Sequence, residues 1–188
     1  MSQRISHVIG IDDAPFEPAH RGDVQILGCV FDHERLDGVV HSRVRRDGVN
    51  STARIDEMVK ASRYYGHLQL VLLQGIAYAG FNVVDIHRLN RLLKLPVVVV
   101  MRRQPDWTAI RSALLHRVAG GRKKWRLIEK AGEVEPVGRV FVQRAGIDLG
   151  QTQELVARLT QRGHIPEPLR CAHLIAGGMS PLFTRQRV

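Results

Sequence analysis

The sequence predicts an α/β fold in which helices flank a mixed β-sheet. Two short and almost wholly apolar runs, at residues 69–73 and 95–100, are typical of strands that are buried on both faces. Segments with apolar residues at helical spacing lie between and after these runs, which favours right-handed crossovers between parallel strands. An earlier group of three strand-like segments contains a tight turn, so we expect these strands to form an antiparallel meander.

The meander is predicted at residues 7–11, 24–31 and 38–44, with the turn at residues 36–38. The first of these strands runs directly into a pair of aspartates. Both acids are therefore expected at the carboxyl end of the strand.

The helices are predicted from capping residues and from apolar spacing. They start near Asn50, Asn82 and Pro105 and also cover residues 153–160 and 166–175, and edge strands are expected at residues 125–128 and 139–142. This order of elements is that of a ribonuclease H-like fold. A doubly wound nucleotide-binding domain is the alternative, but no Gly-x-Gly-x-x-Gly or Walker sequence follows a predicted strand.

The composition is that of an ordinary globular chain. Of the 188 residues, 44% are apolar and 24% are charged, which predicts one domain spanning residues 1–188. No apolar run approaches the ~18 residues of a membrane helix, and no signal segment is evident. Cys29 and Cys171 make neither a disulfide framework nor a zinc motif. We therefore expect a cytoplasmic protein with no membrane partner.

The charge balance points to a partner class. The chain has 28 Lys and Arg residues against 18 Asp and Glu residues, a net charge of +10. A surplus of this size on a small domain favours polyanions, most often nucleic acid. Composition alone fits a merely basic protein equally well.

Asp12 and Asp13 are the first candidate metal ligands. Phosphodiester hydrolysis at neutral pH uses a divalent metal ion, and Mg²⁺ prefers hard oxygen ligands at a point that phosphate can reach. Carboxylates at strand ends offer this arrangement, and strand alternation lets only one of the pair face the site, with Asp12 favoured. The alternative is that the two acids cap a turn before Ala14 and Pro15.

Three further acids are open to two interpretations. Asp47 lies between the third strand and the first helix, as a second ligand or as an ordinary Asp-Gly turn residue. Asp85 lies about one turn into a predicted helix, where an acid also suits the helix dipole. Asp148, with Gln151 three residues later, is typical of a helix N-cap.

The segment at residues 74–82 is an unusual loop to follow so apolar a strand. Its glycines allow close backbone approach and its aromatic residues could stack on a base, so we expect it to bind substrate. The alternative is that the glycines only form turns and the aromatic residues belong to the core. The candidate substrate-binding residues are Gln74, Gly75, Tyr78, Gly80, Phe81 and Asn82. The nine histidines show no zinc-like clustering and are expected to be structural or exposed.

Three motifs carry a family resemblance: residues 9–16, 74–85 and 166–178. Together they resemble a small microbial family related to endonuclease V, the repair nuclease that incises near deaminated bases, and the resemblance covers about residues 5–178. Gly10-Ile-Asp12 is similar to the Gly-x-Asp of endonuclease V, and Arg46-Asp47 is similar to its Arg-Glu. Residues 166–173 resemble its Pro-Glu-Pro-x-Arg-x-Ala-His ending.

The resemblance implies a nuclease that uses Mg²⁺ or Mn²⁺ and acts on DNA, and the nearer family is associated with incision at deoxyuridine. The chain departs from endonuclease V at Gln74, where that enzyme has an aspartate, and at Ile147, where it has a histidine. Its Pro-Tyr-x-Pro-Gly wedge also has no counterpart here. The implied metal site is therefore either rebuilt, with Asp85 or Asp148 replacing the lost ligands, or degenerate.

The leading hypothesis is a Mg²⁺-dependent DNA endonuclease acting at deaminated bases, in which Asp12, Asp47 and Asp85, with Asp13 nearby, hold the metal ion. The second hypothesis is a non-catalytic nucleic-acid-binding module that retains the fold and has lost its ligand set at Gln74. The third is a metabolic enzyme on a similar scaffold, which the lack of a cofactor motif disfavours.

Overall fold

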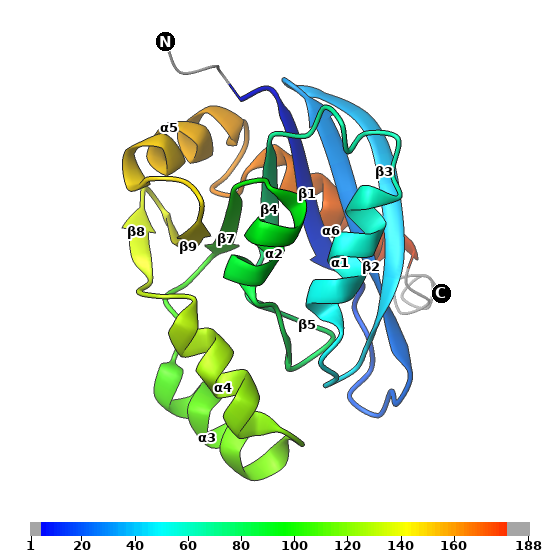
Figure 1. Cartoon of the computed structure of the whole chain (residues 1–188), viewed down its shortest axis with the longest axis vertical. Helices are drawn as coiled ribbons and strands as arrows, with labels where there is room; N and C mark the ends of the chain where they lie inside the picture. Colours follow the sequence, from blue (N-terminus) through cyan, green and yellow to red (C-terminus); the bar gives the residue numbers. More distant parts are fainter. Residues whose placement is uncertain (1–4, 180–188) are drawn as a thin grey trace, which may run out of the picture.

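Three long antiparallel strands form one half of the sheet (Figure 1): β1 (His7–Asp13), β2 (Asp23–Asp32) and β3 (Arg35–Arg45). The structure is a computed structural model that describes residues 5–179. β2 pairs with both of its neighbours along almost its full length. The predicted meander is confirmed, with each strand extended by a few residues.

The other half of the sheet contains the parallel strands. β4 (Leu70–Gln74) runs parallel to β1, and β7 (Val97–Met101) runs parallel to β4. β9 (Val140–Ala145) and β8 (Glu135–Val137) close the sheet in antiparallel pairings. The strand order is β3-β2-β1-β4-β7-β9-β8, so β1, β4 and β7 bring their carboxyl ends to one edge. The predicted mixed sheet is confirmed.

Helices cover both faces of this sheet (Figure 1). α1 (Ser51–Lys60) and α2 (Ile86–Leu93) share one face, where Ile9 and Ile11 of β1 belong to the same buried cluster as Ile55 and Leu89. α5 (Leu149–Leu159) and α6 (Glu167–Met179) pack on the other face, against the alternate side chains of β1 and β4. The side chains on both faces of these strands are thus apolar, as expected for strands that helices cover from both sides.

α6 lies unusually close to β1, and a glycine allows the approach. A Cβ at Gly10 would lie 2.4 Å from the carbonyl carbon of Pro168, which no side chain could tolerate. The backbone of α6 therefore lies directly on the strand that ends in the two aspartates. This contact brings the residues of the Pro166–His173 motif to the sheet edge.

A helical hairpin follows β7 and projects beyond the sheet (Figure 1). It consists of α3 (Trp107–Arg117) and α4 (Gly121–Lys130). The edge strand predicted at residues 125–128 was wrong, because this segment is the middle of α4. Its apolar residues pack at helical spacing, with Ile128 buried and Trp125 in an edge contact to Trp107 at 6.1 Å between ring centroids.

Two predicted helix starts also move. Asn82 does not cap a helix: it lies in the short strand β6 (Asn82–Val83), which pairs with β5 (Ala77–Tyr78), and α2 begins four residues later. The helix predicted from Pro105 begins at Trp107, because Asp106 supplies the N-cap. The predictions for the last two helices are confirmed, with longer bounds.

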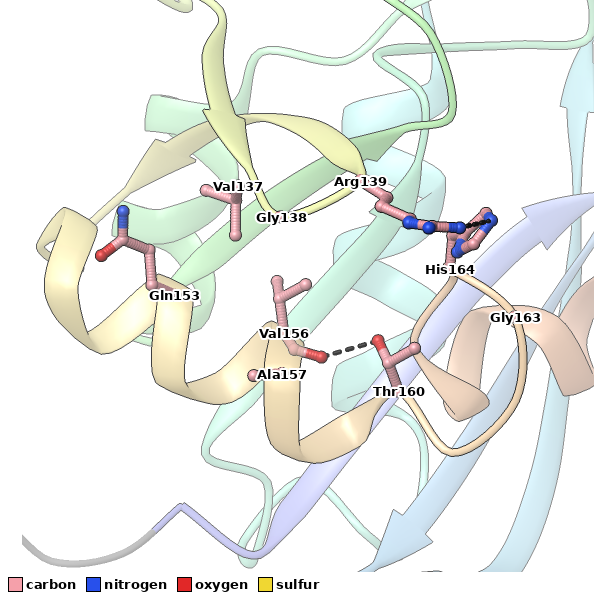
Figure 2. Close-up of a pocket in the computed structure, with 9 residues that line it drawn as sticks. All are labelled: Val137, Gly138, Arg139, Gln153, Val156, Ala157, Thr160, Gly163 and His164. Atoms are coloured by element: carbon pink, nitrogen blue, oxygen red, sulfur yellow. Dashed lines mark hydrogen bonds between the residues drawn. The ribbon is translucent and has the colours of Figure 1, made fainter.

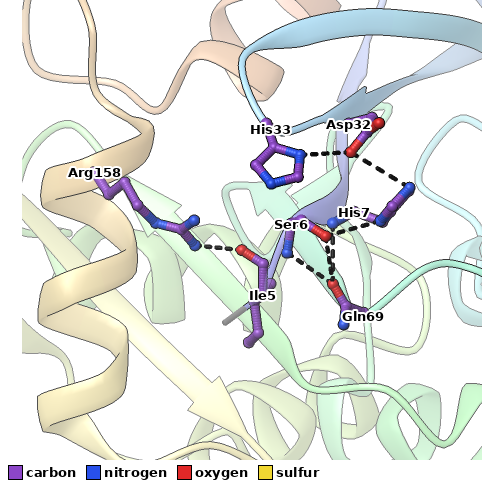
Figure 3. Close-up of polar contacts among 7 residues, drawn as sticks. All are labelled: Ile5, Ser6, His7, Asp32, His33, Gln69 and Arg158. Carbon is purple, nitrogen blue, oxygen red and sulfur yellow. Dashed lines mark hydrogen bonds and ion pairs between the residues drawn. The ribbon is translucent and has the colours of Figure 1, made fainter. Parts of the chain in front are cut away.

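The amino end of β1 is tied down by a polar network at the edge opposite the aspartates (Figure 3). Gln69 Oε1 accepts hydrogen bonds from the backbone N–H groups of Ser6 and His7 at 2.7 and 3.1 Å. Asp32 Oδ1 lies 3.4 Å from His7 Nε2 and 2.7 Å from His33 Nδ1. His7 is thus partly buried in this network and His33 is exposed beside it. Within residues 5–179, no helix has the length and apolar character needed to cross a membrane.

Candidate active site

The carboxyl edge of the central strands gathers polar residues from three chain segments. β1 ends in Asp12 and Asp13, β4 ends in Gln74, and Arg102 directly follows β7. The parallel register pairs Ile11 with Leu73, so Asp12 and Gln74 are the next residues along and project to the same face of the sheet. That face is the one covered by α6.

Asp12 is buried and paired with a histidine of α6. Its side chain is 6% exposed, and its Oδ2 lies 2.8 Å from Nδ1 of His173. Its Oδ1 accepts the backbone N–H of Asp13 at 2.9 Å. Burial raises the pKa of Asp12, and the contacts with His173 and Arg102 only partly offset this effect. The result is a desolvated carboxylate held in a fixed orientation.

His173 is the other half of this pair, and it faces solvent. Its side chain is 56% exposed, and because Nδ1 is engaged by Asp12, Nε2 is the nitrogen free to meet a substrate. Sequence reasoning missed this residue, since the histidines were expected to be structural or exposed. The signal that could have found it is its place at the end of the Pro166–His173 motif.

Gln74 presents an oxygen without a partner. Its Oε1 is buried and accepts no hydrogen bond from the described residues. A buried polar oxygen without a donor costs free energy, so such an atom marks a place where water, an ion or a ligand group is expected. Gln74 was expected to bind substrate, and that role stays a prediction.

Asp13 and Asp47 point elsewhere and hold the loop between β5 and β6. Asp13 Oδ2 accepts the N–H of Ala79 at 2.6 Å, while Asp47 Oδ1 accepts the N–H of Phe81 at 2.8 Å. The N–H of Asp47 also donates to the Ala79 carbonyl at 2.9 Å. Burial raises the pKa of Asp13 to about 6, against the hydrogen bond from Ala79. The buried Lys124 of α4 donates to the Asp47 carbonyl and anchors this loop to the helical hairpin.

Two of the predicted base-stacking or substrate-binding residues are structural instead. Tyr78 is fully buried, and its hydroxyl donates to the Ile11 carbonyl at 2.9 Å. Burial raises the pKa of Tyr78 well above its usual value. Asn82 is also fully buried, and its amide holds the start of α1 by accepting from the N–H of Ser51 at 3.0 Å. The prediction that these two side chains reach substrate was wrong, because the core takes up both.

The remaining loop residues stay accessible. Gly80 is exposed, and Gly75 and Phe81 are half-buried. Gly75 and Gly80 have positive φ angles of 80° and 85°, which favour glycine.

Asp85 and Asp148 cap helices. Asp85 Oδ1 accepts the N–H of Arg88 at 2.9 Å at the start of α2, and its Oδ2 lies 2.7 Å from Lys130 Nζ. Burial would raise the pKa of Asp85, but the hydrogen bonds from Lys130 and Arg88 outweigh it and leave the pKa lowered. Asp148 accepts the N–H of Gln151 at 2.8 Å, as the capping interpretation predicted. The prediction that Asp85 lies one turn inside the helix was wrong.

The sequence matches the family described as Endonuclease dU over residues 4–180. The chain belongs to the endonuclease dU family. A relative in this family, the UPF0215 protein DR_A0167 of Deinococcus radiodurans, is 54% identical over 177 residues, which cover 94% of this chain and 90% of the relative. The family resemblance seen in the sequence is therefore confirmed.

Solved structures show the same fold. The crystal structure of a protein of unknown function from Archaeoglobus fulgidus superposes with a TM-score of 0.87 at 32% identity, covering 94% of this chain and 99% of the other. Endonuclease V of Ciona intestinalis, in complex with a DNA containing an inosine, superposes with a TM-score of 0.56 at 15% identity, covering 90% and 83% of the two chains. The predicted ribonuclease H-like fold is confirmed by these endonuclease dU and endonuclease V relationships.

In this endonuclease dU family member, the site fits a divalent ion that has only a few protein ligands. Within residues 5–179, no group of three or more His, Cys, Asp or Glu side chains is placed to hold a metal ion. The expected set of Asp12, Asp47 and Asp85 is therefore not gathered into one cluster. Asp12 and the unpartnered Oε1 of Gln74 remain as two hard oxygen donors from neighbouring strands, on the same face of the sheet. Mg²⁺ commonly takes one or two carboxylates and completes its shell with water and phosphate oxygens, so these residues fit it.

Proposed function

We propose that the protein is a divalent-metal-dependent DNA endonuclease that hydrolyses phosphodiester bonds at deaminated bases such as deoxyuridine or deoxyinosine. The observation that carries the proposal is the pairing of buried Asp12 with exposed His173, beside the unpartnered oxygen of Gln74. Membership of an endonuclease family supports the reaction class.

Asp12 and Gln74 would hold the ion, Mg²⁺ or Mn²⁺. When bound there, it would supply an activated water and charge stabilisation on the phosphoryl oxygens. Asp47 is not among the proposed ligands, because its Oδ1 accepts the N–H of Phe81 and its Oδ2 lies 3.4 Å from Arg46 Nε. Asp13 and Asp85 leave the proposed ligand set, because each is committed to a backbone N–H and, for Asp85, to Lys130.

His173 would move a proton at the reacting phosphate. Asp12 holds Nδ1 and so fixes the ring orientation, which leaves Nε2 to give a proton to the leaving oxygen or to take one from water. A carboxylate that orients an imidazole in this way is a recurring arrangement in hydrolases.

Charge distribution supports a nucleic-acid substrate. Residues 102–130, which include α3 and α4, carry nine Lys and Arg residues against two Asp and Glu residues, a balance of +7 out of the net +10. This segment starts at the same sheet edge as Asp12 and projects from it (Figure 1). An elongated basic projection beside a site of phosphate chemistry suits a polyanionic strand.

A deaminated base suits the accessible part of the loop at residues 75–81. Gly80 is exposed and carries no side chain, and Phe81 is half-buried next to it. Deaminated and mismatched bases are extruded from a duplex more cheaply than paired ones, so this accessible segment suits them. The inosine-containing DNA bound to the Ciona enzyme supports the same substrate class.

The competing proposal is a nucleic-acid-binding module without catalysis. It is favoured by the neutral Gln74 at a position where a charged ligand would bind metal more strongly. The two proposals differ in whether any strand is cut.

The test uses labelled oligonucleotides that contain one deoxyuridine, one deoxyinosine or no damaged base. Each is incubated with the protein in Mg²⁺, in Mn²⁺ and in EDTA. The proposal expects incision of a damaged strand that requires the metal ion and exceeds incision of the undamaged strand. Binding without incision in every metal would contradict it and favour the binding module.

A further inference from the structure

A cleft rich in arginine lies beside the proposed active site. One hollow of about 250 Å³ is lined by side chains from four segments: Arg102, Arg139, Arg162, His164 and Arg170, with Gly163 and Ile165. A second hollow of about 410 Å³ shares Arg139, Gly163 and His164 with the first. Figure 2 shows this second hollow between the turn from β8 to β9 and α5.

Three of the four arginines form no ion pair with the residues that the structure describes. Within residues 5–179, no salt bridge is formed by Arg102, Arg139 or Arg162, whereas Arg170 pairs with Glu167 through Nε at 2.7 Å. Arg139 Nη1 donates to His164 Nε2 at 3.2 Å, which holds its guanidinium at the boundary of the two hollows (Figure 2). Like charges gathered around one small hollow repel one another, so this arrangement favours an anionic occupant.

The cleft is linked to the Asp12 site from two sides. Arg102 directly follows β7, whose carboxyl end lies at the same edge of the sheet as Asp12, and it also lines the first hollow. Arg170 precedes His173 by three residues on α6, so the two lie on the same side of the helix. An anion in the cleft would therefore lie next to the reacting phosphate without occupying its place.

The second hollow has a different character. Val137, Val156 and Ala157 give it an apolar wall, with Gln153 at one side (Figure 2). Its volume lies within the range of about 300–1,000 Å³ typical of small-ligand sites, which is room for one nucleoside. A charged hollow joined to an apolar one matches the alternation of phosphate and base along a strand.

We propose that this cleft is a second phosphate-binding subsite, in which Arg102, Arg139 and Arg162 hold a backbone phosphate of the substrate strand outside the reacting linkage. The adjoining nucleoside lies in the recess between Val137 and Val156. This assignment rests on the proposed function for its substrate. Guanidinium groups suit it because they bind phosphate oxygens through paired N–H donors.

The test measures binding in EDTA, so that no strand is cut. The probe is a fluorescent single-stranded oligonucleotide, titrated at several salt concentrations with the wild-type protein and with the double variant Arg139→Gln/Arg162→Gln. The matched control is Arg54→Gln/Arg63→Gln, which removes two exposed arginines in and just after α1, on the opposite face of the sheet. Thermal melting of each variant verifies that the fold is kept.

The double variant is expected to bind about tenfold more weakly or worse, and its log–log salt slope on this single strand should fall by about 0.7 if one phosphate is no longer neutralised. The control should keep the wild-type slope. Neutral methylphosphonates are then placed at one linkage at a time. One position should weaken wild-type binding and have no further effect on the double variant, because that variant no longer binds the phosphate at this linkage.

Three outcomes would overturn the subsite: equal affinity and slope for the double variant and wild type, equal losses in the control, or a methylphosphonate effect that is the same in both proteins. Inorganic phosphate separates free anion from strand. If millimolar phosphate raises the wild-type melting temperature while oligonucleotide binding is unchanged by the substitutions, the cleft takes free phosphate and the strand assignment is wrong. Failure of incision alone would contradict the proposed nuclease and leave these binding results unchanged.

Discussion

At the scale of single residues, five aspartates of the same chemistry have different roles because of what surrounds them. Asp12 is buried against His173, Asp13 and Asp47 hold backbone N–H groups of one loop, and Asp85 and Asp148 cap helices. Sequence position indicated that all five lie near element ends. Only the packing of α6 and α4 decides which carboxylate is left for chemistry.

The capping role of Asp85 predicts a selective loss of stability. Asp85→Ala removes the hydrogen bond to the N–H of Arg88 and should cost about 1 kcal/mol, whereas Asp85→Asn keeps a capping oxygen and should cost less. Because the folded-state pKa of Asp85 is lowered, its ionic contribution is present above its unfolded pKa and is lost as the pH falls through the folded value. Urea unfolding across the acid range measures this. A gap between wild type and Asp85→Ala that widens with acid would contradict the account.

At the scale of elements, the β5–β6 hairpin is held from both sides. Asp13 of β1 and Asp47 after β3 each bind its backbone, and Lys124 links Asp47 to α4. Gly80 at its tip lies so close to Asp47 that a Cβ there would come within 2.5 Å of Oδ1. The contacts that position the hairpin therefore require a glycine at position 80.

Two glycine substitutions separate backbone strain from this steric contact. Gly75 and Gly80 both have positive φ, but a Cβ at Gly75 would meet no atom within 4 Å. Gly75→Ala should cost about 1 kcal/mol from strain alone, and Gly80→Ala should cost more because the Asp47 carboxylate must also move. Chemical denaturation of both variants gives the comparison. Equal losses would mean that Asp47 does not constrain the hairpin.

Elements also show what the sequence could and could not predict. The strands and the paired capping residues were predictable, because apolar runs and N-caps are local signals. Residues 125–128 of α4 were mistaken for a strand, since a short apolar run cannot distinguish the two and the contact with Trp107 is not local. The carboxyl end of β1 was predicted as a site, but its partner His173 is 161 residues away and only the close approach at Gly10 brings it there.

At the scale of the whole molecule, the positive charge is uneven. The α3–α4 segment holds most of the surplus and extends the edge at which Asp12, Gln74 and the arginine cleft lie. Exposed residues of α4 such as Arg122, Lys123 and Arg126 form no salt bridge with the part of the chain that the structure describes. This arrangement would guide a polyanion toward one edge of the sheet.

Replacing this charge should weaken binding in a salt-dependent way. The triple variant Arg122→Gln/Lys123→Gln/Arg126→Gln is expected to lower the log–log salt slope by about 0.9 for each phosphate that the variant no longer neutralises, while Arg54→Gln/Arg63→Gln leaves it unchanged. Anisotropy titrations of undamaged DNA over a salt series provide the slopes. An unaltered slope in the triple variant would show that the projecting hairpin does not hold the strand.

The central claim is that Asp12 anchors the chemistry, and one substitution tests it most directly. Asp12→Asn should lower metal-dependent incision of a deoxyuridine or deoxyinosine strand by about 10³-fold or more, because the anionic ligand is lost. Melting temperature and DNA binding in EDTA should hold or rise, since a buried negative charge near phosphate is removed. Asp56→Asn, a change of the same chemistry on α1, serves as the control. Wild-type incision by Asp12→Asn with a lowered melting temperature would contradict the account and make Asp12 a turn residue.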